Sequence, residues 1–459
     1  MKIIDSDLLS IQEARILIEE AKTVREDLLK IDKDERLKLL AKVKGYYKKN
    51  LDLLTASAFE ETCYGKKDDE KKLLNYYLEN LDSQMARYPN LFDIIDGDNE
   101  QKAVTLPKGI SVVFIAPYLV NLTTFQAIYF AIRSASPLII VSDSRCKKTV
   151  TKVVKDIMQV GEDLYYPKGF LAMLEYNSIL GERTLTGDEN VSFIIENILS
   201  KDKREFTNDK ADVFYAEIGN NIVFIDKSAD IDQASLEIIN SKACNNGLLP
   251  GVEQAIVVEA SVVRQVKESF EKHGAYFLTR DQHICLEKIL YDDCHQVRKE
   301  LIGRSAKEIA KIANIKVHEN TKVLIVTKPY VSKKSPYSKE KYNPILSFYV
   351  EDDWLNACEK CVELILNDKK GQSLSIYSND AYVIEQFIEK KPVARVLVNA
   401  PTGFGSIGIG TNLPLTFSLS TKKIAGESGT SLIPNHFMKF KEIGIAKDKS
   451  LAEFLKSIT

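Results

Sequence analysis

Residues 241–258 read SKACNNGLLPGVEQAIVV, and this stretch decides how the rest of the chain is interpreted. A helical pattern runs up to Cys244, and an Asn-Gly pair, a strong turn former, follows at 246–247. The apolar run at 255–258 has the length of a short buried strand. The stretch therefore predicts a helix, a loop that contains Pro250 and a strand, which together form one unit of an α/β fold.

The same alternation extends in both directions from this stretch. Apolar residues recur every three to four positions over 8–24, which predicts an amphipathic helix. The continuous apolar run at 110–116 is typical of a strand that is buried on both faces. Strand and helix patterns then alternate to about residue 399, which predicts parallel sheets covered by helices. Because a second series begins near Asp226, we expect two α/β domains, 1–226 and 227–412.

Composition narrows the class of protein and its partners. The 459 residues are 44% hydrophobic and 28% charged, as in soluble globular proteins, and a formal net charge of −2 argues against nucleic acid or an anionic membrane as a partner. No apolar run reaches the roughly 18 residues of a membrane span. The seven cysteines are an odd number and no secretory signal pattern precedes them, so we expect reduced thiols and a cytoplasmic protein.

One pair of cysteines, Cys358 and Cys361, has the C-x-x-C spacing. The surrounding apolar residues recur at helical intervals, so both sulfurs are expected on one face of a helix. No second pair of ligands and no histidine lies nearby in the sequence, whereas structural zinc needs four ligands. We therefore interpret the pair as structural rather than as a metal or redox site, and we expect no metal centre in this chain.

Eight short stretches occur in an order that is specific to one family. They are EETCYG (60–65), PKGI (107–110), RCKK (145–148), GN (219–220), FID with ADI (224–231), KHGAYFL (272–278), EKYNP (340–344) and RVLVNAP with GSIG (395–408). Together they resemble the CoA-acylating, acetaldehyde and propionaldehyde type, branch of the aldehyde dehydrogenase superfamily. The resemblance implies a Rossmann-like cofactor-type domain and a second, catalytic-type α/β domain. It also implies a C-terminal oligomerisation segment, 413–459, which returns to the first domain or to a partner subunit.

The resemblance makes position 250 the decisive one. In that family a cysteine thiolate attacks an aldehyde, the adduct passes hydride to NAD(P), and the thioester is transferred to coenzyme A. The nucleophile position is Pro250 here, and proline has no group that can attack a carbonyl. Cys244 lies six residues earlier, roughly 9 Å away if helical, which is too far for a substitute nucleophile. We interpret Cys244 as a packed apolar residue.

An oxyanion donor is the second requirement of that mechanism. The family places an asparagine in the turn after its first cofactor-domain strand. Here Val120 fills that place and Asn121 stands one position later. Asn121 is therefore a shifted candidate for the donor, and the alternative is that it caps the helix that follows.

The stretches that would hold the dinucleotide have changed. Residues 141–144 and 371–373 differ from the family's SPHP and GHT, and its glycine-rich turn is ENIL at 196–199. Ile198 and Leu199 add bulk where only glycine permits close approach. We therefore expect neither NAD(P) nor coenzyme A to bind tightly.

Four candidate cofactor contacts remain. Gly219 and Asn220 match a framework motif of the family, and Glu340 with Tyr342 matches the element that addresses the nicotinamide-side ribose. The alternative for Glu340 is a glutamate in a surface loop.

Two functions follow from these observations. The first is a catalytically degenerate homologue that acts as a non-catalytic subunit or regulatory partner, in a homo-oligomer or with an active homologue. The alternative is an active NAD(P)-dependent CoA-acylating aldehyde dehydrogenase with a non-standard nucleophile. Pro250 and the pair at 198–199 discriminate between the two.

Overall fold

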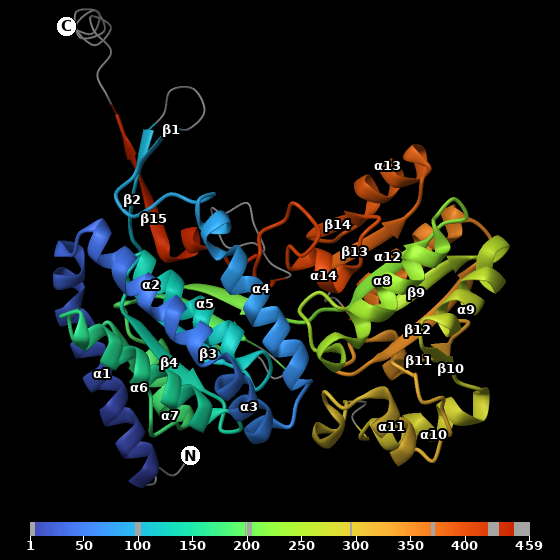
Figure 1. Ribbon diagram of the computed structural model, residues 1–459, viewed down its shortest axis with the longest axis horizontal. Helices are drawn as coiled ribbons and strands as arrows, with labels where there is room; N and C mark the ends of the chain where they lie inside the picture. The colour runs from blue at the N-terminus through green and yellow to red at the C-terminus, as the bar shows by residue number, and fades with distance from the viewer. Residues whose placement is uncertain are drawn as a thin grey trace, which may run out of the picture.

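The protein is built from two parallel sheets that lie side by side, each covered by helices on both faces (Figure 1). The computed structural model describes residues 5–96, 102–197, 199, 204–293, 296–368, 372–420 and 431–444. Ile198 and Gly371 lie outside the described residues, as do 421–430 and 445–459 of the C-terminal segment. The architecture confirms the prediction of a Rossmann-like unit followed by a second α/β unit.

The first sheet has five parallel strands in the order β5-β4-β3-β6-β7. Their bounds are β3 (Ile110–Ile115), β4 (Leu138–Ser142), β5 (Leu171–Met173), β6 (Val191–Asn197) and β7 (Asp212–Ala216). Alternate residues of β3 enter different cores: Val112 and Phe114 face one side, and Val113 and Ile115 the other. This period of two explains why the strand reads as one continuous apolar run.

Helices cover both faces of this sheet. Their bounds are α1 (Asp5–Lys30), α2 (Lys33–Lys49), α3 (Leu51–Thr62), α4 (Lys67–Met85), α5 (Val120–Arg133), α6 (Lys147–Asp163) and α7 (Ile179–Thr186). Residues of α1 and α7 form the core on one face, and α2 to α6 form the larger core on the other. The fully buried α5 lies at the centre of this layer and begins where β3 ends, so it positions the start of the cleft.

The second sheet has seven parallel strands in the order β10-β11-β12-β9-β8-β13-β14. Their bounds are β8 (Asn221–Ile225), β9 (Glu253–Glu259), β10 (Ala275–Phe277), β11 (Val323–Thr327), β12 (Ile345–Glu351), β13 (Ser373–Tyr377) and β14 (Arg395–Val398). Because β8 pairs with β9 and β13, the change of sheet falls between Ala216 and Asn221 and not at 226, where we expected it. The short apolar run of β8 does not show in the sequence which sheet it joins.

The helices of the second unit form two separate layers. Their bounds are α8 (Ile231–Ala243), α9 (Val263–Lys272), α10 (Arg280–Leu290), α11 (Ala306–Ile312), α12 (Trp354–Asp368), α13 (Ala381–Lys390) and α14 (Thr402–Ser406). Residues of α8 and α9 cover one face of the sheet, and α12 and α13 cover the other. Cys358 and Cys361 lie on one face of α12, as predicted, because both side chains point into this core.

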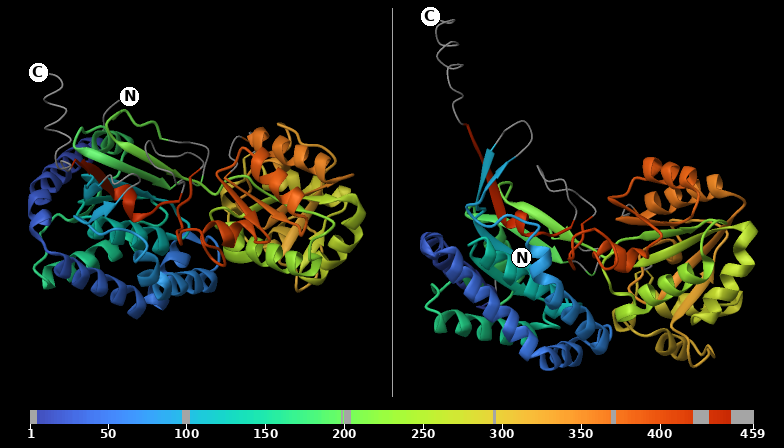
Figure 2. Two further views of the ribbon diagram at one scale, coloured as in Figure 1. Left: turned by 90° about the horizontal axis from the view of Figure 1, so that it is seen from above. Right: turned by 45° about the horizontal axis from the view of Figure 1, so that its top comes forward.

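A small antiparallel sheet joins distant parts of the chain. It contains β1 (Ile94–Asp96), β2 (Lys102–Pro107) and β15 (Met438–Ile443), and β15 pairs with β2 along its whole length. This ribbon extends from the first unit (Figure 2). Leu415, Phe417 and Leu419 also enter the large core of that unit. The described part of the C-terminal segment thus lies on the first unit of its own chain.

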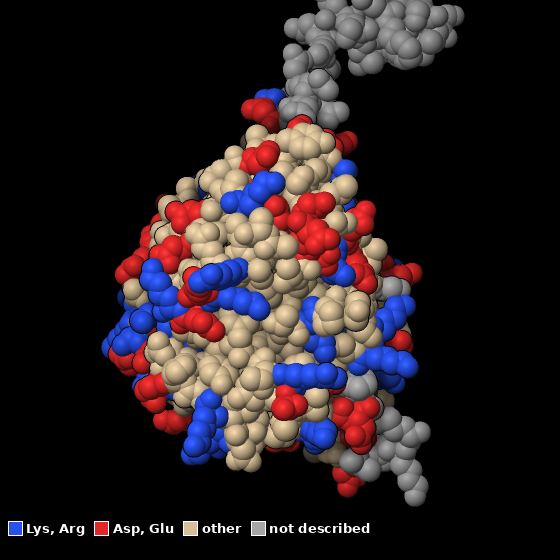
Figure 3. Space-filling view, turned by 90° about the vertical axis from the view of Figure 1, so that its right-hand side faces the viewer, with Lys and Arg blue, Asp and Glu red and all other residues tan. Residues whose placement is uncertain are grey.

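Both signs of charge are interspersed on the outer face of the second unit (Figure 3). This distribution agrees with the nearly balanced totals of 63 basic and 65 acidic residues. None of the helices within the described ranges is long and apolar enough to cross a membrane.

Candidate active site

A cleft of about 1070 Å³ lies between the first sheet and the second unit. The first sheet contributes its carboxyl edge, with Ala116 after β3, Asp143 after β4 and Glu196 in β6. The second unit contributes Asp292, residues 296–299, Ile302 and Tyr342. Ligands of open parallel sheets bind outside the carboxyl ends of the strands, so this cleft is the candidate site.

The loop between α8 and β9 has an unusual backbone. Asn245, Asn246 and Gly247 are consecutive residues in the left-handed region, with φ of 47°, 53° and 78°. A Cβ on Gly247 would lie 2.5 Å from the carbonyl oxygen of Asn343, so only glycine fits there. Asparagine tolerates this conformation better than most residues, which explains the Asn-Asn-Gly sequence.

Hydrogen bonds from three other segments hold this loop. The Asn246 amide donates to the carbonyl oxygens of Gly65, at 2.9 Å, and Gly303, at 2.7 Å. The backbone N–H of Lys66 donates to Asn245 Oδ1 at 2.8 Å, and the Asn245 N–H donates to Asp69 at 2.8 Å. Because these bonds cross between the units, the loop is fixed from both sides of the cleft.

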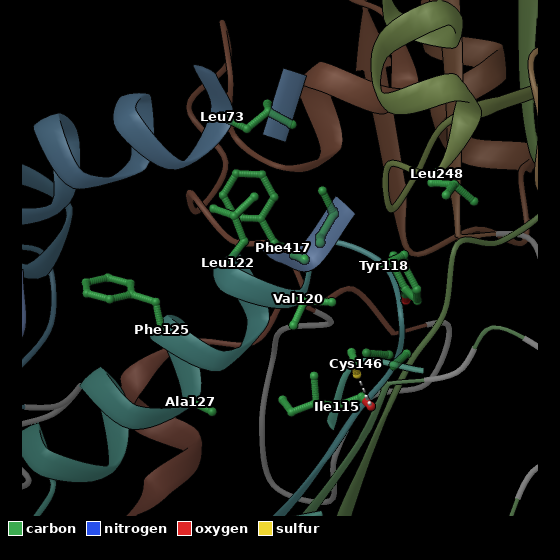
Figure 4. Close-up of a cluster of buried hydrophobic side chains, with 14 of the residues drawn as sticks. Leu73, Ile115, Tyr118, Val120, Leu122, Phe125, Ala127, Cys146, Leu248 and Phe417 are labelled. Carbon is green, nitrogen blue, oxygen red and sulfur yellow. Dashed lines mark hydrogen bonds between the residues drawn. The ribbon is translucent and has the colours of Figure 1, made fainter. Parts of the chain in front are cut away.

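Pro250 is buried at the end of this loop, next to the fully buried Leu248 and Leu249. The N–H of Gly251 donates to the carbonyl oxygen of Ile218 at 2.9 Å, which ties the loop to the start of β8. Leu248 belongs to the same apolar cluster as Tyr118 and Ile115, which follow and end β3 (Figure 4). Pro250, at the position that the resemblance assigns to the nucleophile, therefore lies in apolar surroundings.

Cys244 lies at the C-terminal end of α8 and packs against the large core. Burial raises the pKa of its thiol well above the ordinary value, and the carboxylate of Asp69 adds to this effect. A thiol of this kind stays protonated at neutral pH and is a poor nucleophile. These surroundings suit the interpretation of Cys244 as a packed apolar residue.

Asn121 is fully buried at the second position of α5 and contacts Glu70 of α4. Its backbone N–H and its side-chain amide both donate to Glu70 Oε1, at 3.1 and 3.0 Å, and the amide also donates to the Leu54 carbonyl oxygen at 3.1 Å. Burial raises the pKa of Glu70, and the bonds from Asn121 oppose this shift. A role as oxyanion donor would require Asn121 to break these bonds.

Asn121 does not cap α5, as the alternative interpretation expected. The N-cap is Leu119, in the left-handed region, and its side chain makes no capping hydrogen bond. The carboxylate of Glu70 accepts from the first turn instead, so it takes the place of a capping side chain.

Glu340 is buried, with 7% of its surface exposed, so the interpretation as a surface-loop glutamate is wrong. Its Oε1 accepts from the Gly219 N–H at 2.6 Å, and its Oε2 accepts from the Tyr342 hydroxyl at 2.8 Å. Burial raises the pKa of Tyr342 well above its ordinary value, and the adjacent carboxylate adds to this shift. Three of the four predicted cofactor contacts thus meet each other.

Asn220, the fourth of these residues, binds backbone carbonyl groups of two other segments. Its amide donates to the carbonyl oxygens of Ser338 and Leu364, each at 3.3 Å. These bonds connect the start of β8 to the loop before Glu340 and to α12.

Two fully buried lysines lie beside the loop, and sequence analysis did not select them. Lys242 Nζ donates to Gln254 Oε1 at 3.3 Å, and Lys341 Nζ donates to the Gln254 and Lys339 carbonyl oxygens, at 3.0 and 2.9 Å. Burial lowers the pKa of Lys242 to about 7, although the carboxylates of Glu253 and Glu340 oppose the shift. Burial also lowers the pKa of Lys341 well below its ordinary value.

An arginine occupies the part of the cleft that faces β3 and β6. Arg204 forms ion pairs with Glu182, at 2.8 Å, and with the buried Glu196, at 3.0 Å, and its guanidinium lies 4.3 Å from the centre of the Phe114 ring. Glu196 stands at the first position of the segment that replaces the family's glycine-rich turn. Leu199, also in this segment, is buried and lines the cleft.

Glu196 and Leu199 stand in the segment for which the resemblance implies a glycine-rich turn, whose backbone N–H groups would approach a pyrophosphate. Arg204 was not selected from the sequence, because its partners are 22 and 8 positions away. The available signal was Glu196, the one charged residue of β6, next to the last residue of the strand. Within the described ranges, no group of three or more His, Cys, Asp or Glu side chains is arranged to hold a metal ion.

Comparisons with known proteins agree with the resemblance. No protein-family model matches the chain. It is 30% identical over 239 residues, 51% of the chain, to an aldehyde-alcohol dehydrogenase of Clostridium acetobutylicum, of which it covers 28%. It is 25% identical over 407 residues to a succinate-semialdehyde dehydrogenase (acetylating) of Clostridium kluyveri, and this match covers 86% of the chain and 88% of that protein.

A solved structure shows the fold over the whole chain. The acetylating aldehyde dehydrogenase of Geobacillus thermoglucosidasius superposes with a TM-score of 0.88 at 24% identity, covering 97% of this chain and 99% of that one. The chain spans less than half the length of the aldehyde-alcohol dehydrogenases it matches, between 28% and 45%.

Proposed function

We propose that this chain, a homologue of the CoA-acylating aldehyde dehydrogenases, is a non-catalytic member of that group that acts as a subunit or regulatory partner. The observation that carries the proposal is Pro250, an inert residue at the nucleophile position of a loop that is fixed by hydrogen bonds to both units. No other group in the loop compensates, because Leu248 and Leu249 are apolar and the pKa of Cys244 is raised by burial.

The cofactor-type cleft supports the same proposal independently. Arg204 forms ion pairs with both Glu182 and Glu196 inside it, and Glu340 is bound by Gly219 and Tyr342. We expect NAD to bind more weakly than about 1 mM, which is roughly 4 kcal/mol of binding free energy. Calorimetric titration of the unmodified protein measures this directly, and a low micromolar dissociation constant would contradict the proposal.

The catalytic test is an assay of NAD(P)H with acetaldehyde and coenzyme A, and with acetyl-CoA and NADH in the reverse direction. We expect no change above the buffer blank, because loss of a covalent nucleophile typically costs several orders of magnitude in rate. We also expect the Pro250→Cys variant to remain inactive, since a thiol there has no dinucleotide beside it.

The alternative function, an active enzyme with a non-standard nucleophile, has its own signature. Turnover by the unmodified protein that disappears in Cys244→Ser alone would establish that alternative. The cleft of about 1070 Å³ is the observation that favours a bound ligand. A shift of the melting temperature with coenzyme A but not with NAD would assign a binding role to it.

A partner role is tested by assembly. Co-expression with an acylating aldehyde dehydrogenase from the same source, followed by light scattering of the purified complex, gives the stoichiometry. A mixed oligomer, or a homo-oligomer of this chain, agrees with the proposal. A monomer that does not associate with the active homologue contradicts it.

A further inference from the structure

A lysine and two cysteines meet on the far side of the second unit, outside the cleft. Cys358 and Cys361 point from α12 into the core, with 3% and 0% of their surfaces exposed. Lys391, the residue that ends α13, is 7% exposed, and its Nζ is in direct contact with Cys358 Sγ as a hydrogen-bond donor. The two residues are 33 positions apart, so the fold rather than local spacing brings them together.

An aromatic ring lies against the lysine nitrogen. Lys391 Nζ lies 4.1 Å from the centre of the Phe387 ring, and Phe387 stacks on Phe224 of β8 with ring centres 4.7 Å apart. Among the described residues, Lys391 forms no ion pair with a carboxylate, and the nearby Glu351 pairs with Lys360. The sulfur of Cys358 accepts the hydrogen bond of this buried nitrogen.

The two cysteines differ in their contacts. Cys358 Sγ accepts a hydrogen bond directly from Lys391 Nζ, so a nitrogen stands beside this sulfur. The thiolate is the reactive form of cysteine. Burial raises the pKa of Cys361 to about 12, and Lys391 only partly opposes that shift. Cys361 therefore stays a protonated thiol at neutral pH.

We propose that Cys358 and Lys391 form a peroxide-sensitive modification site, in which oxidation links the sulfur of Cys358 to the nitrogen of Lys391. This proposal replaces the structural interpretation of the C-x-x-C pair. It involves neither Pro250 nor the cleft, so it stands whether or not the chain is catalytic.

The reaction is balanced with one molecule of hydrogen peroxide. The Cys358 thiolate attacks one peroxide oxygen and the O–O bond breaks; with the Lys391 proton, this gives a sulfenic acid, a neutral amine and one water. The amine nitrogen then attacks sulfur, the S–O bond breaks, and the departing oxygen leaves as a second water. Sulfur is oxidised by two electrons and peroxide is reduced. A dithiol reductant reverses the step, returning a thiol and an amine while it forms its own disulfide.

The geometry favours lysine over Cys361 as the group that captures the oxidised sulfur. The Lys391 nitrogen already contacts Cys358 Sγ, whereas Cys361 is a protonated thiol that lies one turn further along α12. The bond would close the segment 358–391, which includes β13 and α13, and would fasten α12 to the end of α13. The edge strand β14 begins four residues after Lys391.

The test is mass spectrometry of the full-length protein after hydrogen peroxide, alkylation of free thiols and digestion. We expect a cross-linked peptide that contains Cys358 and Lys391, lighter than its two reduced components by two hydrogens and absent after dithiothreitol. The Lys391→Arg variant keeps a cation beside sulfur and should lose the link. The Cys361→Ser variant should retain it, and this variant also decides the case if Lys391→Arg does not fold.

Three results would overturn the proposal. One is a disulfide between Cys358 and Cys361 as the product in the unmodified protein. Another is a Cys358 that oxidises to sulfinic acid without any link to Lys391. The third is a Cys358 that stays reduced at a peroxide concentration that oxidises the exposed Cys63, which serves as the internal control.

Discussion

Cys244 and Cys358 are both shielded thiols of the second unit, but the charges around them differ. Cys244 caps α8 just before a loop held by hydrogen bonds that involve side chains, and an adjacent carboxylate adds to the rise of its pKa. Cys358 lies on a regular helix and receives a hydrogen bond from an ammonium group. The first is close in sequence to the family's nucleophile position and the second is far from it. Proximity to a motif is therefore a weaker guide to reactivity than the charged group that contacts the sulfur.

The lysine nearest to Cys244 in sequence strengthens this contrast. Lys242 stands two residues before it, but burial lowers the pKa of Lys242 to about 7, so much of its charge is lost at neutral pH. Lys391 is also buried, yet it directs its nitrogen at a sulfur. Three measurements can break or sharpen the comparison.

The largest effect is expected from Gly247→Ala, which tests whether the loop around Cys244 is rigid. A Cβ at this residue would lie 2.5 Å from the Asn343 carbonyl oxygen, and the φ of 78° is unfavourable for alanine. The Asn343 oxygen belongs to the backbone, and the loop that would carry the new Cβ is held by other contacts, so we expect the free energy of unfolding to fall by about 3 kcal/mol or more. Urea denaturation measures the loss.

The matched control is Gly45→Ala, on the exposed face of α2, where a Cβ meets nothing within 4 Å. Alanine stabilises such a helical position by about 0.5–1 kcal/mol. Equal midpoints of urea denaturation for Gly247→Ala and Gly45→Ala would show that the loop adapts to the added Cβ. In that case Cys244 could also change its position.

The second effect concerns the reactivity of the Cys244 thiol. Because its pKa is raised, we expect alkylation by iodoacetamide at pH 7 to be at least about 100-fold slower than at the exposed Cys63. Peptide mass spectrometry over time gives both rates in one sample. Comparable rates would mean that the thiol is accessible and ionised. The proposal of a non-catalytic role would then lose the support that it takes from the raised pKa of Cys244.

The sequence predicted the architecture well, because its signal is periodic and local. Buried strands such as 110–115 and amphipathic helices such as 5–30 are visible as apolar patterns. The order of the short motifs indicated the family resemblance, which implied the fold. The sheet that β8 joins was not visible in the sequence, because its short apolar run reads the same in either sheet, so the change of sheet precedes the boundary that we expected at 226.

The site was less predictable, because its contacts join distant residues. Asn121 was considered alone, but its partner Glu70 is 51 positions away. Glu340 was matched to a ribose contact, although its partner Gly219 is 121 positions away and within the same chain. A single sequence shows neither pairing, since hydrogen bonds between side chains leave no periodic pattern.

The smallest effect is a pH dependence that belongs to Lys242. Its pKa is about 7 in the folded protein and 10.5 ordinarily. Between these values the unfolded chain binds a proton that the folded chain does not, so the free energy of unfolding should rise as pH increases from about 7 to 10.5, and the contribution should be lost as pH falls to 7. The expected slope is at most about 1.4 kcal/mol per pH unit. The Lys242→Met variant lacks this proton, whereas Lys341, whose pKa is lowered in the same direction, contributes to both proteins. The difference in unfolding free energy, unmodified protein minus variant, should therefore increase with pH.

The control is Lys38→Met on the exposed face of α2, which should leave the curve parallel to that of the unmodified protein, because this side chain is in water in both states. A difference that stays constant for Lys242→Met would show that Lys242 keeps its proton when folded. A further cation, beside Lys66 and Lys72, would then stand near Cys244, and the contrast with Cys358 would be reduced.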